Sequence, residues 1–143
     1  MNKMMVSGHK GKKHKTTSGH NTGKATKLYK IIEKTLMIIE QQTKKNPIEV
    51  LVKAIENAAP REEITTIEYG GARYPQAVDT APLRRIDVAL RQMTQGAYSK
   101  SFNSRSPIEK TLAEEIMNAY NMDQKSTAIA KKLELERQAD ASR

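Results

Sequence analysis

Lysine side chains are concentrated at the start of this chain. Residues 1–30 contain eight lysines and no acidic residue, whereas residues 31–143 contain 17 basic and 16 acidic residues, so almost all of the formal net charge of +9 lies in the first fifth of the sequence. Clustered ammonium groups neutralise phosphates and release the counterions that surround a polyanion. We expect a nucleic acid as the partner rather than a lipid surface, because residues 7–23 have almost no apolar side chains.

Residues 7–23 are polar, rich in glycine and without periodicity, which is typical of a loop. We predict that this basic loop binds phosphates as it becomes ordered on RNA. The alternative is a solvated tail with no ligand. The predicted phosphate-binding side chains of this loop and of the helix that follows it are Lys10, Lys12, Lys13, Lys15, Lys24 and Lys27.

The same loop contains His9, His14 and His20, which raises the possibility of a metal site or a nuclease. The chain has no cysteine, and its first acidic residue is Glu33. The loop therefore lacks the ligands that most often complete a histidine metal site. We expect these histidines to be ordinary polar groups, with no metal and no cofactor.

Patterns that accompany catalysis are missing from the sequence. No glycine-rich phosphate loop follows a predicted strand, and no serine has the strand–turn–helix setting of a nucleophile elbow. Glu62 and Glu63 are adjacent, so in a strand their carboxylates point to opposite faces and make a poor acid–base pair. We predict that the protein is not an enzyme. With no signal-peptide pattern and no apolar run of about 18 residues, we expect a cytoplasmic location.

A glycine pair, Gly70-Gly71, predicts a β-hairpin over residues 63–79. A two-residue hairpin turn requires positive φ at both central positions, and glycine meets this requirement without strain. The flanking residues are β-branched and aromatic, as strands prefer. Pro75 must lie where no ladder hydrogen bond is needed. Such a ribbon is marginal alone, so we expect a partner to cover it, with Gly70, Gly71, Arg73 and Tyr74 at the contact.

Arginine side chains follow the hairpin directly, on a helix predicted over residues 82–98. Arg84 and Arg91 are seven residues apart and share a face, and Arg85 lies about 100° around the helix. A guanidinium group can bind two phosphate oxygens at once or stack on a base, so three arginines beside a ribbon suit folded RNA. It is the family resemblance given below that implies RNA binding by all three. The alternative is an ordinary solvated face in which Asp87 pairs with them.

The remaining chain predicts further helices and one core. Residues 1–6 resemble the end of a helix, and longer helices are expected over 24–45, 47–59, 107–122 and 126–139. Thr22, Asn46 and Ser106 are the predicted N-caps, with Glu49 and Glu109 completing capping boxes. The side chains expected to face inward are Leu28, Ile31, Ile32, Thr35, Leu36, Ile38, Ile39, Ile48, Leu51, Val52, Ile55, Leu83, Ile86, Leu90, Met93, Ile108, Leu112, Ile116, Ala119, Ile129 and Leu133.

An ordered set of motifs resembles the family of small-subunit ribosomal protein seven, in its archaeal and eukaryotic form. The set comprises Asn2-Lys-Met-Met5, Gly23-Lys24, Asn46-Pro-Ile-Glu-Val-Leu-Val52, Ala59-Pro-Arg-Glu62, Gly70-Gly-Ala72 with Tyr74, Gln76-Ala-Val78, Pro82-Leu-Arg-Arg85, Ala89-Leu-Arg91 and Lys131-Lys-Leu-Glu-Leu-Glu-Arg137. These motifs span nearly the whole chain. By comparison with the family, the sequence is short at its N-terminus.

The resemblance implies a mainly α, single-domain protein over residues 1–143, with five to six helices and a β-hairpin protruding between the second and third complete helices. It implies a structural role on the ribosome: binding small-subunit ribosomal RNA, nucleating assembly of the head, and contacting neighbouring small-subunit proteins. It also implies that the ribbon lies near exit-site tRNA and mRNA, at the subunit interface. It also implies that the C-terminal helix contacts RNA, through Lys131 and Lys132. We expect the basic loop, ribbon and first long helix to form one concave cationic face.

Two other functions remain compatible with the residues alone. A DNA-architectural protein could use a β-ribbon arm in the minor groove. A helical protein-interaction module could use the apolar helix faces, in which case the loop lysines would be unimportant for binding.

Overall fold

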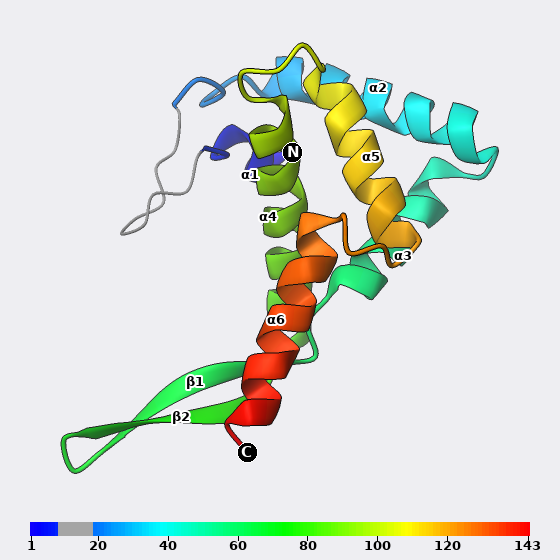
Figure 1. Cartoon of the computed structure of the whole chain (residues 1–143). Helices are drawn as coiled ribbons and strands as arrows, with labels where there is room; N and C mark the ends of the chain where they lie inside the picture. The colour runs from blue at the N-terminus through cyan, green and yellow to red at the C-terminus, as the bar shows by residue number, and fades with distance from the viewer. Residues whose placement is uncertain (9–18) are drawn as a thin grey trace.

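The described part of the chain is mostly helical, and it comprises residues 1–8 and 19–143 of a computed structural model (Figure 1). An antiparallel hairpin lies between the second and third long helices, which confirms the predicted fold class. Most of the predicted basic loop, residues 9–18, lies outside the described residues. The elements are α1 (Asn2–Met5), α2 (Ala25–Thr43), α3 (Pro47–Ala58), β1 (Glu62–Tyr69), β2 (Ala72–Asp79), α4 (Pro82–Ser101), α5 (Ile108–Tyr120) and α6 (Thr127–Ala141).

Local capping chemistry determines where two helices begin. Asn46 Oδ1 accepts a hydrogen bond from Ile48 N at 3.0 Å and Pro47 occupies the first turn of α3, as the sequence predicts. The Ser126 side chain accepts a hydrogen bond from Ile129 N at the start of α6. Both caps satisfy backbone N–H groups that have no partner within their own helix.

The N-caps predicted at Thr22 and Ser106 are wrong. Gly23 has a left-handed φ of 75°, so the chain turns before α2 begins and Lys24 becomes the N-cap residue. Pro107 is the N-cap residue of α5, and its carbonyl accepts the first hydrogen bonds of that helix at 3.2 Å. In each case the helix begins one or two residues later than predicted.

Helix α5 is the centre of the core and contacts α2, α3, α4 and α6 (Figure 1). Its Ala113 and Ala119 have no exposed surface, and neither has Ala54 of α3. Alanine lets helix backbones approach closely, and the larger Leu28 and Ile39 of α2 are fully buried in the same core cluster. In the described ranges, no helix combines the length and the hydrophobicity needed to cross a membrane.

The buried face of α3 differs from the prediction. Ile48 and Val52 were expected to face inward but are 60% and 50% exposed. The buried positions are instead Val50, Ala54 and Ala58. Two of these three side chains are alanines, which suits the close approach of helix backbones, and α3 contacts α5.

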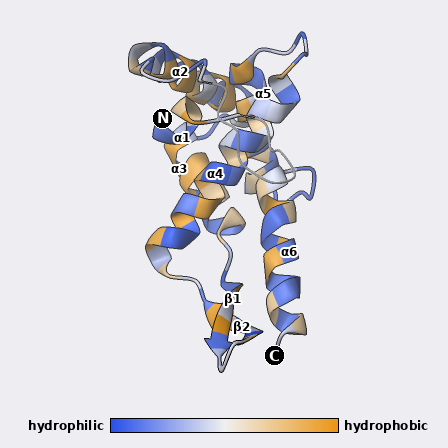
Figure 2. Cartoon of the chain, turned by 90° about the vertical axis from the view of Figure 1, so that its left-hand side faces the viewer, coloured by the Kyte–Doolittle hydropathy of each residue, from blue (hydrophilic) through white to orange (hydrophobic). Residues whose placement is uncertain are grey.

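The predicted inward faces of α4 and α6 are also only partly correct. Leu83 and Ile86 are 81% and 46% exposed, whereas Met93 on the same stripe is buried. The first turns of α4 lie next to the hairpin and away from α2 and α5, so those two helices do not cover them there (Figure 2). Leu133 of α6 is likewise 44% exposed, while Ile129 one turn earlier is buried.

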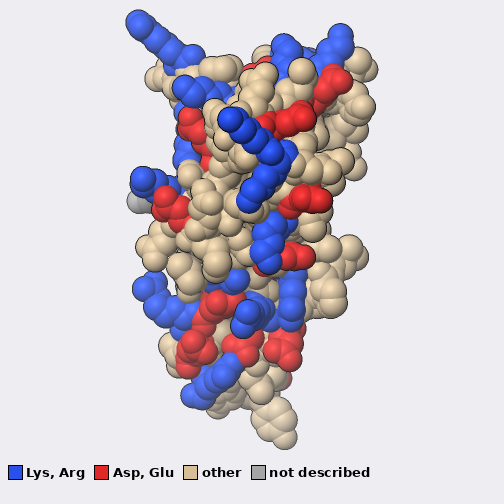
Figure 3. All heavy atoms as spheres, turned by 90° about the vertical axis from the view of Figure 1, so that its right-hand side faces the viewer, with Lys and Arg blue, Asp and Glu red and all other residues tan. Residues whose placement is uncertain are grey.

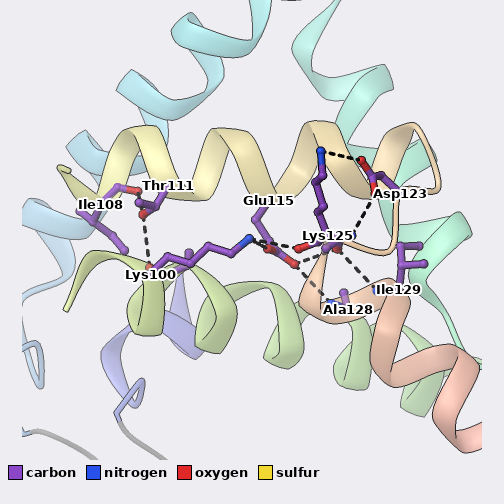
Figure 4. A network of polar contacts seen from close by, with 10 residues as sticks. Lys100, Ile108, Thr111, Glu115, Asp123, Lys125, Ala128 and Ile129 are labelled. Atoms are coloured by element: carbon purple, nitrogen blue, oxygen red, sulfur yellow. Dashed lines mark hydrogen bonds and ion pairs between the residues drawn. The ribbon is translucent and has the colours of Figure 1, made fainter. Parts of the chain in front are cut away.

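A buried acidic side chain joins α4, α5 and α6. Glu115 of α5 has no exposed surface, and its carboxylate accepts hydrogen bonds from Ser126 Oγ at 2.8 Å and Ala128 N at 3.2 Å (Figure 4). Lys100 Nζ of α4 pairs with the same carboxylate at 2.8 Å. Gly96 permits this approach, since a Cβ there would lie 2.6 Å from Thr127 Oγ1. The carboxylate therefore caps the N-terminus of α6 from a neighbouring helix.

The hairpin protrudes from the helices, and its strands pair in register from Glu62 with Asp79 to Tyr69 with Ala72 (Figure 1). Gly70 and Gly71 have φ values of 58° and 82°, which confirms the predicted two-residue turn. All residues from 65 to 76 are exposed, while the root of the hairpin contacts α6. The tip is therefore held by its root alone.

We predict that Gly70→Val disorders the tip and leaves the helices intact. Valine in the left-handed region costs at least about 1–2 kcal/mol, but the tip touches nothing that could transmit the strain. Amide resonances of residues 67–74 should broaden while the melting temperature changes little. Ala72→Val, next to the turn in a strand, is the matched control and should preserve those resonances. Loss of the whole fold in Gly70→Val would contradict the independence of the tip.

Candidate nucleic-acid interface

Some of the predicted phosphate-binding lysines lie in the described part of the chain, and others lie outside it. Lys10, Lys12, Lys13 and Lys15 lie outside the described residues. Lys24 and Lys27 are exposed at the start of α2, and Lys30 is exposed one turn later. The first N–H groups of α2 have no side-chain cap, and these cations oppose the helix dipole unless an anion binds at the same end. The arrangement suits a phosphate.

Arg84 and Arg91 lie on one face of α4, as predicted, but acidic neighbours pair with both. Arg84 Nε is 2.6 Å from Glu63 Oε1 of β1, and this contact raises the pKa of Arg84. Arg91 Nη2 is 2.5 Å from Asp87 Oδ2 one turn earlier. Each guanidinium retains N–H groups beyond the one in the ion pair. The alternative in which Asp87 pairs with the arginines is therefore correct for Arg91.

Asp87 also forms an ion pair with Lys3 of α1. A hydrogen bond from Lys3, together with the positive charges of Lys3 and Arg91, lowers the pKa of Asp87 below its ordinary value. This ion pair attaches the one-turn helix α1 to α4. Sequence analysis did not identify it, because the two residues are far apart in the chain.

We predict that Asp87 contributes to acid sensitivity. A carboxyl whose pKa is lower in the folded than in the unfolded chain stabilises the fold above the unfolded value, near about 4. That contribution disappears as pH falls through the folded-state pKa. Urea unfolding should therefore show that the free energies of unfolding of Asp87→Asn and the parent differ at neutral pH. The two values should converge as the solution becomes acidic. A difference between them that does not depend on pH would contradict this assignment.

Arg85 has a different position from the other two arginines. It is partly buried, and its Nε donates to Thr80 O at 2.8 Å, while Nη2 donates to Arg61 O at 3.4 Å. Those carbonyls belong to the two chain segments that enter and leave the hairpin. Arg85 therefore links the two ends of the hairpin root, and two of its five N–H groups are already used.

The tip of the hairpin presents one aromatic face. Residues paired across the ribbon point to the same side, so Ile67 and Tyr74 share a face with Tyr69. Tyr69 and Tyr74 are 81% and 60% exposed. The opposite face at this level bears the ion pair of Arg73 with Glu68 at 3.7 Å. Sequence analysis missed Tyr69, although the two-residue turn already fixes the register that places it beside Tyr74.

The expectation that the ribbon is part of a cationic face is wrong. Its strands contain one basic residue, Arg73, and four acidic residues, Glu62, Glu63, Glu68 and Asp79. Three of these carboxylates are paired with arginines. The ribbon can therefore offer an aromatic surface and a paired arginine, but it supplies no excess positive charge. The unpaired cations of this site must come from elsewhere in the chain.

Lys131 and Lys132 of α6 are engaged in contacts within the protein. Lys131 Nζ pairs with Glu134 at 2.8 Å, and this contact lowers the pKa of Glu134. Lys132 Nζ donates to Asn57 O at 2.8 Å at the end of α3. On the face away from the hairpin tip, lysines and arginines alternate with acidic side chains (Figure 3). Positive charge is not concentrated on that face.

The candidate interface is therefore on the side of α4 from which the hairpin projects. The segment that leads into α2 lies on this side at one end of α4, and the hairpin lies at the other end (Figures 1 and 2). Arg84 and Arg91 lie on α4 itself. Among the described residues, no group of three or more histidine, cysteine or acidic side chains could hold a metal ion. The arrangement can bind an extended polyanion, and no catalytic set accompanies it.

A comparison with known proteins shows the family. The model of the family described as Ribosomal protein S7p/S5e matches residues 1–143. The chain belongs to the S7p/S5e family. The resemblance in the sequence motifs is thus confirmed, and the S7p/S5e match extends over the helices, the hairpin and the basic loop alike.

Archaeal relatives support the S7p/S5e assignment. The chain is 60% identical over 141 residues to the small ribosomal subunit protein uS7 of Nanoarchaeum equitans, which covers 99% of this chain and 71% of that protein. It is 50% identical to the uS7 proteins of Archaeoglobus fulgidus and Picrophilus torridus, over 87% and 85% of this chain. The aligned residues span 64% and 65% of those two proteins.

Proposed function

We propose that this chain is a structural, non-catalytic component of the small ribosomal subunit that binds its ribosomal RNA. The S7p/S5e match over residues 1–143 is the observation that carries the proposal. The charge distribution supports it independently, because a lysine-rich N-terminal segment is suited to phosphates.

The proposed mechanism assigns different chemistry to each part of the interface. The lysines of the basic loop and of the start of α2 neutralise phosphates and hold one stretch of RNA. The arginines of α4 bind the RNA that crosses the middle of the protein through N–H groups that no protein contact uses. Arg84 and Arg91 can also exchange their carboxylate partner for a phosphate. The aromatic face of the hairpin contacts bases or sugars, since it has no positive charge to offer a phosphate. Segments of RNA that repel one another are thereby held on one rigid protein.

The finer parts of the proposal follow the family resemblance. The protein nucleates assembly of the head of the small subunit, and its ribbon lies near exit-site tRNA and the mRNA path. Neighbouring small-subunit proteins contact the remaining surface. The exposed apolar residues Leu83 and Ile86 are candidates for such contacts.

Binding to small-subunit RNA tests the proposal directly. The purified chain should bind that RNA at moderate salt, protect one junction from chemical cleavage, and co-sediment with small subunits. Duplex DNA of equal length is the competitor that represents a DNA-architectural function. Equal binding to both, with bending of the DNA, would favour that alternative function and contradict ours.

We predict that Arg84→Ala and Arg85→Ala each weaken RNA binding by about 1–3 kcal/mol, because each removes a charge-assisted contact. At Arg84 the loss should concern RNA binding more than stability, since the Arg84 side chain is 53% exposed. Arg85→Ala should also loosen the hairpin root. Filter binding measures the affinities. Glu63→Gln is the matched control: it releases Arg84 without removing it, so affinity should be unchanged or higher. Weaker binding in Glu63→Gln would show that the ion pair itself is required.

A further inference from the structure

The direction of the hairpin cannot be set by its exposed part. Residues 65–76 contact no other element closely enough to be covered. The strands join the helices through short links, residues 59–61 and 80–81. A small rotation at this root would move the tip by a large distance, so something must fix the root if the tip is to meet a defined partner.

The C-terminal half of α6 contacts the root of the hairpin. Glu136 Oε1 accepts a hydrogen bond from Arg61 N at 3.2 Å, immediately before β1. Arg143, just after α6, forms an ion pair with Glu62 of β1. Ala139, between these two residues in the sequence, has no exposed surface. Helix α6 contacts both strands and lies along the root (Figure 1).

The other end of α6 is fixed in the helical core. The buried Glu115 carboxylate binds Ser126 Oγ and Ala128 N, and the same carboxylate pairs with Lys100 of α4 (Figure 4). In the middle of α6, Lys132 donates to Asn57 O at the end of α3. Helix α6 is thus attached at its start, its middle and its end, to three separate parts of the protein.

We propose that α6 is a splint that sets the direction of the hairpin, with Glu136 and Arg143 as the positioning residues at the root. Neither residue needs to touch RNA for this role. Only the consequence of this role, the presentation of the aromatic tip to RNA, rests on the proposed function. The splint itself is a property of the protein without ligand.

Distances between two spin labels test the splint in the free protein. The chain has no cysteine, so Ala72→Cys at the hairpin tip and Lys34→Cys on α2 would be the two labelling sites, and both are exposed. Pulsed dipolar spectroscopy should give a narrow distance distribution in this labelled parent. Adding Glu136→Gln and Arg143→Gln should broaden the distribution by about twofold or more, as the root opens locally.

A charge-matched control is available on the same helix. Glu134→Gln with Arg137→Gln changes the charges identically, but the hydrogen bonds of Glu134 are made within α6, to Lys131 and Gln138. The control should keep the narrow distribution, and thermal melting should show that the helical core is intact in both variants. An unchanged distribution in Glu136→Gln/Arg143→Gln, or equal broadening in the control, would overturn the proposal.

Chemical probing on small-subunit RNA separates this inference from the proposed function. In the Glu136→Gln/Arg143→Gln variant, the RNA protection given by the hairpin should weaken more than the protection given by the basic loop. An equal loss of protection at both places would overturn the role of the splint in presenting the tip. A parent chain that binds no RNA, with broadened distances still seen in the free variant, would refute the proposed function and leave the splint standing.

Discussion

Replacing Glu115 with alanine is expected to lower the free energy of unfolding by about 3–5 kcal/mol. The substitution leaves Lys100 without its buried partner, and it leaves Ser126 Oγ and Ala128 N without an acceptor in a place that water does not reach. Each unsatisfied buried donor costs about 1–3 kcal/mol. Urea or guanidinium unfolding should show a lower midpoint with little change in the dependence on denaturant.

Glu114→Ala is the matched control for this prediction. Glu114 precedes Glu115 on α5, has the same charge, and is exposed. Its substitution should change the free energy of unfolding by less than about 0.5 kcal/mol. Glu115→Gln should fall between the two, since an amide oxygen can still accept from Ser126 but cannot pair ionically with Lys100. Equal stability of the Glu115→Ala and Glu114→Ala variants would contradict the role given to the buried carboxylate.

The difference between these two glutamates also shows where sequence reasoning stops. Local signals predicted several features correctly: Asn46 and Pro47 start a helix through bonds to their own neighbours, and Gly70-Gly71 makes a turn through its own dihedral angles. Nothing local distinguishes Glu115 from Glu114. The distinction arises only when Ser126, eleven residues later, returns to the same place.

Which side of each helix is buried was difficult to predict, because it too depends on neighbouring elements and not on local sequence. In α3, Ile48 and Val52 are more hydrophobic than Ala54, yet the alanine is buried and the larger residues are exposed. Hydrophobicity predicts that a helix has a buried face, but the distance to the neighbouring helix decides which side chains fit there. The exposed Leu83 shows the related limit that one turn of a helix can remain uncovered while the next turns are buried.

The candidate site was also predicted only in part from the sequence. Residue type and spacing placed Arg84 and Arg91 together on one face of α4, and they placed the glycines at a hairpin tip. They could not show that Glu63 reaches Arg84, or that Lys3 reaches Asp87. These acidic partners compensate the charges of Arg84 and Arg91, which can bind a phosphate only through their remaining N–H groups or by exchanging the carboxylate for it. The lysines of the N-terminal segment therefore carry most of the uncompensated charge.

Neutralising the loop lysines should consequently cause the largest loss of RNA affinity. Changing Lys10, Lys12, Lys13 and Lys15 to glutamine together should weaken RNA binding about a hundredfold or more near 0.1 M salt. Each phosphate that loses its lysine also keeps its counterion, so the entropy of counterion release is lost as well. The slope of log affinity against log salt should fall by about 0.7–0.9 for each contact that is removed. Affinities measured by filter binding between about 0.05 and 0.2 M salt give both quantities.

A matched variant distinguishes these lysines from net charge in general. Lys34, Lys44, Lys53 and Lys125 are exposed on other parts of the protein, and changing all four to glutamine alters the net charge equally. That variant should lose far less affinity and keep the parent salt dependence, since only contacts with phosphate contribute to the slope. Equal losses in both variants would show a diffuse electrostatic attraction rather than a bound loop. Unchanged binding in the loop variant would instead favour a protein-interaction module, for which these lysines are unimportant.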